Sequence, residues 1–433
     1  MSVRTVSVSE LGSYDGQDVL IQGWVSGFRS SGKVSFIEIR DGSGFVQAVA
    51  QESDLDAAGR EALGKLGLES SLRVCGRVSR HPKREGVYEL QASGISLLQA
   101  AHDYPLGRKD HGPDFLLQNR HLWLRSRSQW AIIRIRNTVI KATYDFLFSE
   151  GFIKIDSPII TASACEGTTT LFEFDYFDLG KGYLSQSGQL YLEAAIAAHA
   201  KVFDFGPVFR AEKSKTRKHL TEFWMMDAEM AFFDHDANLS FQERLITHLV
   251  QEVLKHNRAE LAIMNRDTGV LEKIKPPFKR VTHGEVVKIL RELGSEITEA
   301  TDLGANDETL LQQVYSEPVF IEKWPAKIKA FYMKRWPAEP DYVCAADLMA
   351  PEGFGELIGG SQREDDYEVL LARMQEENMP VEEFQWYLDL RRFGSVPHSG
   401  FGFGLERIVN WLSGAEHIRE TIPFPRLLYR MRP

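Results

Sequence analysis

The 23 residues from Phe209 to Ala231, FRAEKSKTRKHLTEFWMMDAEMA, predict two antiparallel β-strands joined by a long charged loop. The loop, Lys213–His219, carries five basic residues when its histidine is included. Arg210 and Glu212 lie two residues apart in the first strand. The period of an extended strand therefore places their side chains on one face of the sheet.

The second half of the stretch places an aromatic ring and two carboxylates on one face by the same period of two. These residues are Phe223, Asp227 and Glu229. A sheet face with a cation, carboxylates and a ring, beside a basic loop, suits a polyanionic ligand with a flat ring, such as ATP. A solvated hairpin with surface ion pairs explains the same residues, so the stretch alone leaves both interpretations open.

The order FRAE, basic loop, HLTEFWMMDAEMAF resembles motif 2 of the class II aminoacyl-tRNA synthetases. It is most similar to the aspartyl, asparaginyl and lysyl subgroup of that family. The resemblance implies a multidomain protein, with an N-terminal OB-type β-barrel and an α+β catalytic domain built on an antiparallel sheet. It also implies an enzyme that uses ATP and Mg²⁺ to join an amino acid to tRNA.

The same resemblance implies roles for four residues of the motif 2 stretch. Arg210 contacts the α-phosphate of ATP and is one of two catalytic arginines. Phe223 stacks on the adenine, and Glu212 lies at the amino edge of that ring. His219, at the end of the basic loop, is assigned to the ATP site with them.

Length and composition set the broad class. A chain of 433 residues is long enough for two domains, and 43% hydrophobic with 26% charged residues is typical of a soluble globular protein. The sequence predicts no membrane span and no signal peptide. Its three cysteines, Cys75, Cys165 and Cys344, show no CxxC spacing, which favours a reducing cytoplasm. The net charge of −10 gives no global sign of a nucleic-acid partner, although a local basic face can still bind RNA.

Residues 1–100 predict an OB-type barrel, because three strands, a helix and two more strands follow one another with tight turns. Phe36 and Gln47 fall on adjacent strands, where the ring can stack on a base and the amide can read its edge. A core position for Phe36 is the alternative. A linker at residues 101–118 separates the barrel from the catalytic domain, residues 119–433.

GWV followed by SFIEIRDGSGFVQAV is similar to the anticodon-binding barrel of the same synthetase subgroup. The resemblance implies that Phe36 and Gln47 recognise the central uridine of the anticodon. Arg29, in the predicted loop between the first two strands, is assigned to contacts with the tRNA backbone.

Residues 125–150 predict one long amphipathic helix, and a strand interrupted by Pro158 follows it. A proline there favours an edge or an interface over a central paired strand. A long helix, a strand and a proline resemble motif 1, which implies a homodimer through this segment. A helix of the core is the alternative.

The substrate amino group is assigned to four residues by the resemblance. Glu166 lies in a polar loop, Ser187 and Gln189 lie at a strand-to-helix turn, and Asp227 comes from motif 2. Helix capping is the alternative role for the turn residues. Residues 238–342 give mixed signals and are expected to be a variable insertion without chemistry.

The stretch DYVCAADLMAPEGFGELIGGSQRE brings together two carboxylates and an arginine. Two acidic oxygens beside a triphosphate suit Mg²⁺, which takes few protein ligands and keeps several waters. The stretch resembles the magnesium-binding strand of the family, which implies that Asp347 and Glu356 bind the metal. Arg363 then grips the oxygen of the substrate side chain, and Glu356 also belongs to the ATP site.

SGFGFGLERIVNWLSG places Gly400, Gly402 and Gly404 on one face of a strand, which leaves that face bare for a planar adenosine. Arg407, in the first turn of the next helix, can reach phosphate oxygens. The segment resembles motif 3, which implies that Arg407 is the second catalytic and ATP-binding arginine. The spacing is neither GxGxxG nor GxxxxGK[ST], which argues against a dinucleotide fold and a P-loop.

The amino acid is predicted from SGQLYLE, which has Leu192 where aspartyl enzymes carry a lysine. With Arg363 as the only cation, a neutral amide oxygen is the better match, because an unpaired buried charge costs several kcal/mol. SGQLYLE, EFWM and TIPFPR all resemble the asparaginyl-tRNA synthetases, which implies L-asparagine and tRNA(Asn) as substrates. Asp227 is an aspartyl-type feature, so an aspartyl enzyme, discriminating or not, is the alternative. A non-catalytic RNA-binding paralogue is a third reading.

Overall fold

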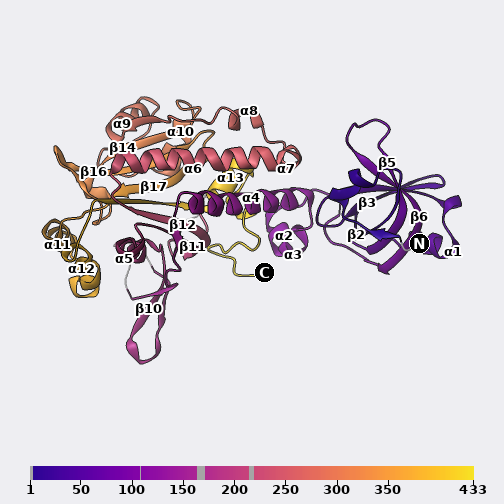
Figure 1. Cartoon of the computed structure of the whole chain (residues 1–433), viewed down its shortest axis with the longest axis horizontal. Helices are drawn as coiled ribbons and strands as arrows, with labels where there is room; N and C mark the ends of the chain where they lie inside the picture. Colours follow the sequence, from indigo (N-terminus) through magenta and orange to yellow (C-terminus); the bar gives the residue numbers. More distant parts are fainter. Residues whose placement is uncertain (1–2, 108, 163–170, 214–218) are drawn as a thin grey trace. The chain divides into compact units, whose positions relative to one another are not determined.

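The computed structural model describes residues 3–107, 109–162, 171–213 and 219–433. The chain forms two compact units, Met1–Leu116 and Leu117–Pro433 (Figure 1).

The first unit is an OB-type barrel, as the alternating strands predict. Its sheet has the order β1-β2-β3-β4-β6-β5, and a further pairing of β2 with β5 closes it. Ile37 and Ile39 of β3 point inward with Val46 and Ala48 of β4, so every second residue enters the core. The elements are β1 (Arg4–Thr5), β2 (Asp18–Ser31), β3 (Val34–Arg40), β4 (Phe45–Gln51), α1 (Ala57–Gly64), β5 (Ser71–Arg80) and β6 (Tyr88–Gln99).

The second unit is built on a nine-stranded sheet that is mostly antiparallel. Its order is β13-β14-β16-β17-β18-β12-β11-β7, and β15 pairs with β16. The strands are β7 (Ile153–Lys154), β11 (Lys201–Phe209), β12 (Glu222–Ala231), β13 (Lys279–Thr282), β14 (Val319–Pro325), β15 (Arg335–Trp336), β16 (Glu339–Ala350), β17 (Gly355–Gln362) and β18 (His398–Gly404). A small sheet pairs β10 (Lys181–Leu184) with β8 (Ile160–Thr161) and β9 (Glu173–Asp175).

Three helices cover one face of the large sheet and bury the main core. They are α4 (Arg127–Ser149), α6 (His235–His256) and α13 (Leu405–Ser413), and α4 and α6 lie side by side in Figure 1. The other helices of this unit are α3 (Arg120–Trp123), α5 (Gln189–His199), α7 (Arg258–Ile263), α8 (Thr268–Leu271), α9 (His283–Glu292), α10 (Ala305–Leu311), α11 (Tyr367–Glu376) and α12 (Gln385–Arg392), and α2 (Pro113–Gln118) spans the boundary between the units.

The hairpin of β11 and β12 forms as its sequence predicts. Met226, Ala228 and Met230 of β12 enter the helix-covered core, so the intervening side chains face the opposite side of the sheet. β11 ends at Phe209, one residue before Arg210, so Arg210 and Glu212 lie in the loop and not in the strand.

The region 238–342 differs from the expected insertion without chemistry. It supplies most of α6 to the core, and it supplies β13, β14 and the first residues of β16 to the large sheet. Within the described residues, no helix is long and apolar enough to cross a membrane.

Candidate active site

One cavity of about 1120 Å³ lies in the second unit, on the face of β12 that points away from the main core. The described residues that the sequence assigns to substrates and metal in this unit all line it, and Glu166 lies outside the described residues. These lining residues are Ser187, Gln189, Arg210, Glu212, His219, Phe223, Asp227, Asp347, Glu356, Arg363 and Arg407. The structure therefore brings together segments that are up to 220 positions apart in the chain (407 − 187).

The turn between β10 and α5 forms one side of the cavity. Ser187 Oγ donates a hydrogen bond of 2.8 Å to Asp227 Oδ2, and the backbone N–H of Gly188 donates another of 2.8 Å to the same oxygen. Ser187 Oγ also accepts from the backbone N–H of Gln189 at 3.0 Å, at the start of α5. The N-cap residue of α5 is Gly188, so Ser187 does not cap the helix; its hydroxyl accepts from the first N–H of α5 and at the same time fixes the carboxylate of Asp227.

Gln189 is held by a buried polar network behind the cavity. Its Nε2 donates to Glu193 Oε1 at 3.1 Å, one helical turn along α5. Glu193 Oε2 in turn accepts from Tyr387 Oη at 2.7 Å and from Arg391 Nη2 at 2.5 Å. Burial opposes ionisation of Glu193, but Arg391 and His398 outweigh it and lower the pKa of this carboxyl. The hydrogen bond to Glu193 holds the side-chain amide of Gln189 in one orientation, and this also sets the direction of its carbonyl oxygen.

Asp227 is only 5% exposed, and no cation forms an ion pair with it among the described residues. Burial raises the pKa of Asp227 to about 6, although the hydrogen bonds from Gly188 and Ser187 act against this shift. An ionised carboxylate in this position is therefore costly without a ligand and is suited to bind an ammonium group.

We expect Asp227→Asn to stabilise the ligand-free protein at pH 8 but not at pH 4. Asp227 stays protonated up to about pH 6 in the folded protein but only up to about pH 3.9 in the unfolded chain. Its contribution to the free energy of unfolding is therefore present below about pH 3.9 and is lost as the pH rises from there through about 6. The free energy of unfolding should rise by about 1–3 kcal/mol at pH 8. Urea denaturation at both pH values tests this, and an equal change at both would contradict it.

Arg363 forms a buried ion pair at the end of β17. Its Nη2 donates to Glu229 Oε1 at 2.5 Å and its Nη1 to Ser361 Oγ at 2.7 Å, and both ionic side chains are less than 5% exposed. The guanidinium also lies 5.3 Å from the ring centre of Tyr332, which lines the cavity. Glu229 thus already neutralises the arginine that the sequence assigns to the substrate side chain.

The side of the cavity that the sequence assigns to phosphates and adenine carries two arginines. The guanidinium of Arg210 lies 5.6 Å from the ring centre of Phe223, and it donates to the carbonyl of Gln186. Arg407 lies in the first turn of α13. Its Nη1 donates to the backbone oxygen of Glu356 at 2.9 Å and to the carboxylate oxygen Oε2 of the same residue at 3.3 Å. An aromatic face with cations beside it can hold the base and the phosphates of a nucleotide.

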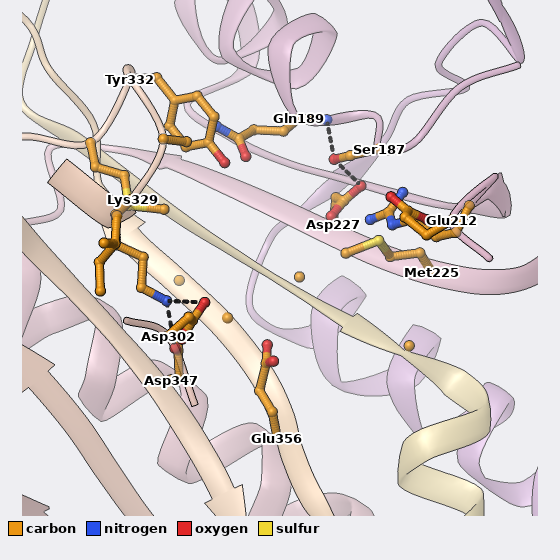
Figure 2. A pocket seen from close by; sticks show the side chains of 18 of the residues that line it. Ser187, Gln189, Glu212, Met225, Asp227, Asp302, Lys329, Tyr332, Asp347 and Glu356 are labelled. Carbon is orange, nitrogen blue, oxygen red and sulfur yellow. Dashed lines mark hydrogen bonds and ion pairs between the residues drawn. The ribbon is translucent and has the colours of Figure 1, made fainter. Parts of the chain in front are cut away.

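Asp347 and Glu356 meet above Gly359, which lies directly across from Asp347 in the pairing of β16 with β17. A Cβ at Gly359 would lie 3.1 Å from Glu356 Oε1 and 3.7 Å from Asp347 Oδ1. The glycine therefore leaves open a space that both carboxylates border, which fits a hard cation with few protein ligands. Figure 2 shows these carboxylates on one side of the cavity and Ser187, Gln189 and Asp227 on the other.

The glycines of β18 correct one expectation. A Cβ at Gly400 would lie 2.0 Å from Glu229 Oε1, and one at Gly402 would lie 2.4 Å from Asp227 Oδ1. These two glycines make room for buried carboxylates of the paired strand β12 and do not leave a bare strip for adenosine. Gly404 lies beside Phe223, because a Cβ at Gly404 would lie 3.6 Å from that ring, and both Gly402 and Gly404 line the cavity.

The comparisons with known proteins follow the same two units. The sequence matches the OB-fold nucleic acid binding domain at residues 19–98 and the tRNA synthetases class II (D, K and N) at residues 112–428. It is 51% identical to an asparagine–tRNA ligase of Pelotomaculum thermopropionicum, over the full length of both chains. The chain belongs to the asparaginyl-tRNA synthetase family.

Solved structures of asparaginyl-tRNA synthetases agree with this assignment. The crystal structure from Pyrococcus horikoshii, complexed with asparaginyl-adenylate, has a TM-score of 0.95 and 41% identity, covering all of both chains. The Entamoeba histolytica enzyme, also in complex with asparaginyl-adenylate, has a TM-score of 0.90 and 30% identity, covering 100% of this chain and 99% of that one.

Leu192, which the sequence places where aspartyl enzymes are expected to carry a lysine, does not line the cavity. It is fully buried with Ile196 against Val202 and Ala231. Leu192 and Ile196 share a face of α5 because they are four residues apart, whereas Gln189 and Glu193 share another. The leucine at position 192 therefore contributes to the packing of α5 and not to the cavity wall.

In the barrel, the residues assigned to the anticodon lie together on its outer surface. Phe36 is half-buried outside the apolar core, and the guanidinium of Arg29 lies 4.4 Å from its ring centre. Gln47 Nε2 donates to Glu89 Oε1 at 2.6 Å. Arg29 belongs to β2 and not to a loop, which corrects that expectation.

Lys329 and Tyr332 line the cavity but were not predicted. They lie between β14 and β15, in the region expected to be an insertion. The only signal in the sequence is the segment KIKAFYMK, which has no spacing that points to a site without knowledge of the fold.

Proposed function

We propose that this chain ligates L-asparagine to tRNA(Asn) in two steps at the cavity of the second unit. The carboxylate of asparagine attacks the α-phosphate of ATP and gives asparaginyl-adenylate and pyrophosphate. The terminal ribose hydroxyl of tRNA then takes the asparaginyl group and releases AMP. The observation that carries the proposal is one cavity that the carboxylate, amide and arginine side chains of separate motif stretches line together.

The first step requires positioning and charge stabilisation rather than proton removal, because the attacking carboxylate is already ionised at neutral pH. Arg210 is assigned to the α-phosphate and Arg407 to the distal phosphates, with Phe223 stacking on the adenine. Glu406 anchors the start of α13, since it accepts from Arg136 Nη1 at 2.7 Å and from the backbone N–H of Trp224 at 3.1 Å. This buried bridge fixes the neighbouring Arg407 in place.

Asp347 and Glu356 are the residues that would hold Mg²⁺. A bound divalent cation would reduce the repulsion between the phosphates and the attacking carboxylate. The protein itself contributes the open space at Gly359, which both carboxylates border, and the cations that pair with these carboxylates, Lys329 and Arg407.

The amino acid is assigned to the opposite side of the cavity. Asp227, Ser187 and Gln189, with Glu166 from outside the described residues, surround the α-ammonium group. Arg363 faces the side-chain oxygen of the substrate. Because Glu229 already pairs with Arg363, a substrate carboxylate would find no uncompensated charge there, which favours asparagine over aspartate.

Two partners complete the proposal: tRNA, bound in part by the barrel, and a second copy of the chain. The segment that resembles motif 1 exposes an apolar group, which supports a homodimer through it. These exposed residues are Phe148, Ile153, Ile159 and Ile160.

Phe36→Ala should raise the KM for tRNA(Asn) by about 10–100-fold, because stacking one base contributes about 1–3 kcal/mol. Adenylate formation should stay unchanged, since Phe36 belongs to the barrel. Charging of a tRNA(Asn) transcript, followed beside pyrophosphate exchange, tests the tRNA part of the proposal. An equal loss of both activities would show that Phe36 supports the fold and does not read the anticodon.

A further inference from the structure

Lys329 carries an ammonium group that is nearly enclosed in the cavity wall. Its side chain is 12% exposed, and its Nζ lies 2.7 Å from Asp347 Oδ2 and 4.0 Å from Asp302 Oδ2. The same nitrogen lies 3.8 Å from the ring centre of Trp324 (Figure 2 labels Lys329 and its carboxylate partners).

The backbone at Lys329 is held in place by hydrogen bonds from a neighbouring arginine. Arg373 of α11 donates through Nη2 to the carbonyl oxygens of Ala326 and Lys329, at 2.6 and 2.8 Å. This clamp holds the segment after β14 against the cavity. Lys329 is therefore a built part of the site and not a surface lysine that meets a carboxylate by chance.

Both proposed metal ligands have a cationic partner of their own. Asp347 pairs with Lys329, and Glu356 Oε2 lies 3.3 Å from Arg407 Nη1. The charges of the two carboxylates are thus balanced within the protein. A divalent cation entering alone would meet two fixed positive charges, and both would repel it.

We propose that Lys329 is the internal counter-ion of Asp347, so that the free pocket binds a divalent cation weakly and the metal enters together with the nucleotide. The phosphates of ATP bring the negative charge that lets lysine, arginine and metal occupy the site at once. This inference rests on the proposed function, because that function assigns Asp347 and Glu356 to the metal. Lys329 is a positioning residue in this scheme, acting on the metal through Asp347.

The test measures Mn²⁺ binding by the enhancement of water proton relaxation, which requires no catalysis. Wild-type protein should bind Mn²⁺ at least about tenfold more weakly without ATP than with it. Lys329→Met should bind Mn²⁺ without nucleotide at least about tenfold more tightly than wild type. Lys329→Arg keeps the charge and should behave as wild type, and Asp347→Asn added to Lys329→Met should abolish the gain.

Two outcomes overturn the inference. One is equal Mn²⁺ affinity of the wild-type protein with and without ATP, a result that does not depend on the folding of any variant. The other is a Lys329→Met protein that binds Mn²⁺ no better than wild type. Failure of the proposed function looks different: Asp347→Asn in the wild-type background would then leave ATP-dependent Mn²⁺ binding unchanged, which refutes the metal assignment and the inference together.

Discussion

Arg210→Ala is expected to lower asparagine-dependent ATP–pyrophosphate exchange by about 10²–10³-fold, the usual cost of removing one group that stabilises transition-state charge. Arg210 lies beside Phe223 in the cavity and donates to the carbonyl of Gln186, and it is the arginine proposed to contact the α-phosphate. Since negative charge grows on that phosphate during attack, the loss should fall mainly on kcat.

A conservative and a distant variant serve as controls for this result. Arg210→Lys keeps the charge but loses the planar fork, and it should recover part of the rate. Arg244→Ala removes an exposed arginine of α6 that pairs with Glu150, and it should exchange at the wild-type rate. Near-normal exchange by Arg210→Ala would refute its assignment to the α-phosphate.

Arg363→Leu is expected to abolish asparagine activation and also to lower the free energy of unfolding by about 3–5 kcal/mol. The second effect arises because Glu229, which is 1% exposed, would keep a buried charge without its partner. Thermal or urea unfolding measures the stability, and pyrophosphate exchange measures the activity.

The double variant Arg363→Leu/Glu229→Leu separates the two effects. Replacing both members of a buried pair by apolar residues is often neutral, so the stability should return. Asparagine activation should not return, because the group that faces the side-chain oxygen is still absent. A double variant that activates asparagine would show that Arg363 only supports the fold.

Short-range patterns predicted much of this molecule. The β11–β12 hairpin, α4, the strand β18 followed by α13, and the barrel all form where period and turn residues place them. Each of these elements depends mainly on its own residues, and the motif stretches carry the predicted site residues into one cavity.

The errors come from the registers between strands, which a single sequence does not reveal. Gly400 and Gly402 face the carboxylates of β12 because β18 pairs with that strand, and the glycine spacing alone does not show what fills the gap. Lys329 meets Asp347 only because β14 pairs with β16. Leu192 faces the core because of the way α5 is rotated on the sheet, and a single sequence does not reveal that rotation.

ATP–pyrophosphate exchange with asparagine and aspartate run side by side tests the central claim most directly. Exchange that depends on asparagine, with little or none on aspartate, is the predicted result, because Glu229 neutralises Arg363 in a cavity built for adenylate formation. Equal or faster exchange with aspartate, or no exchange with either amino acid, would contradict the account.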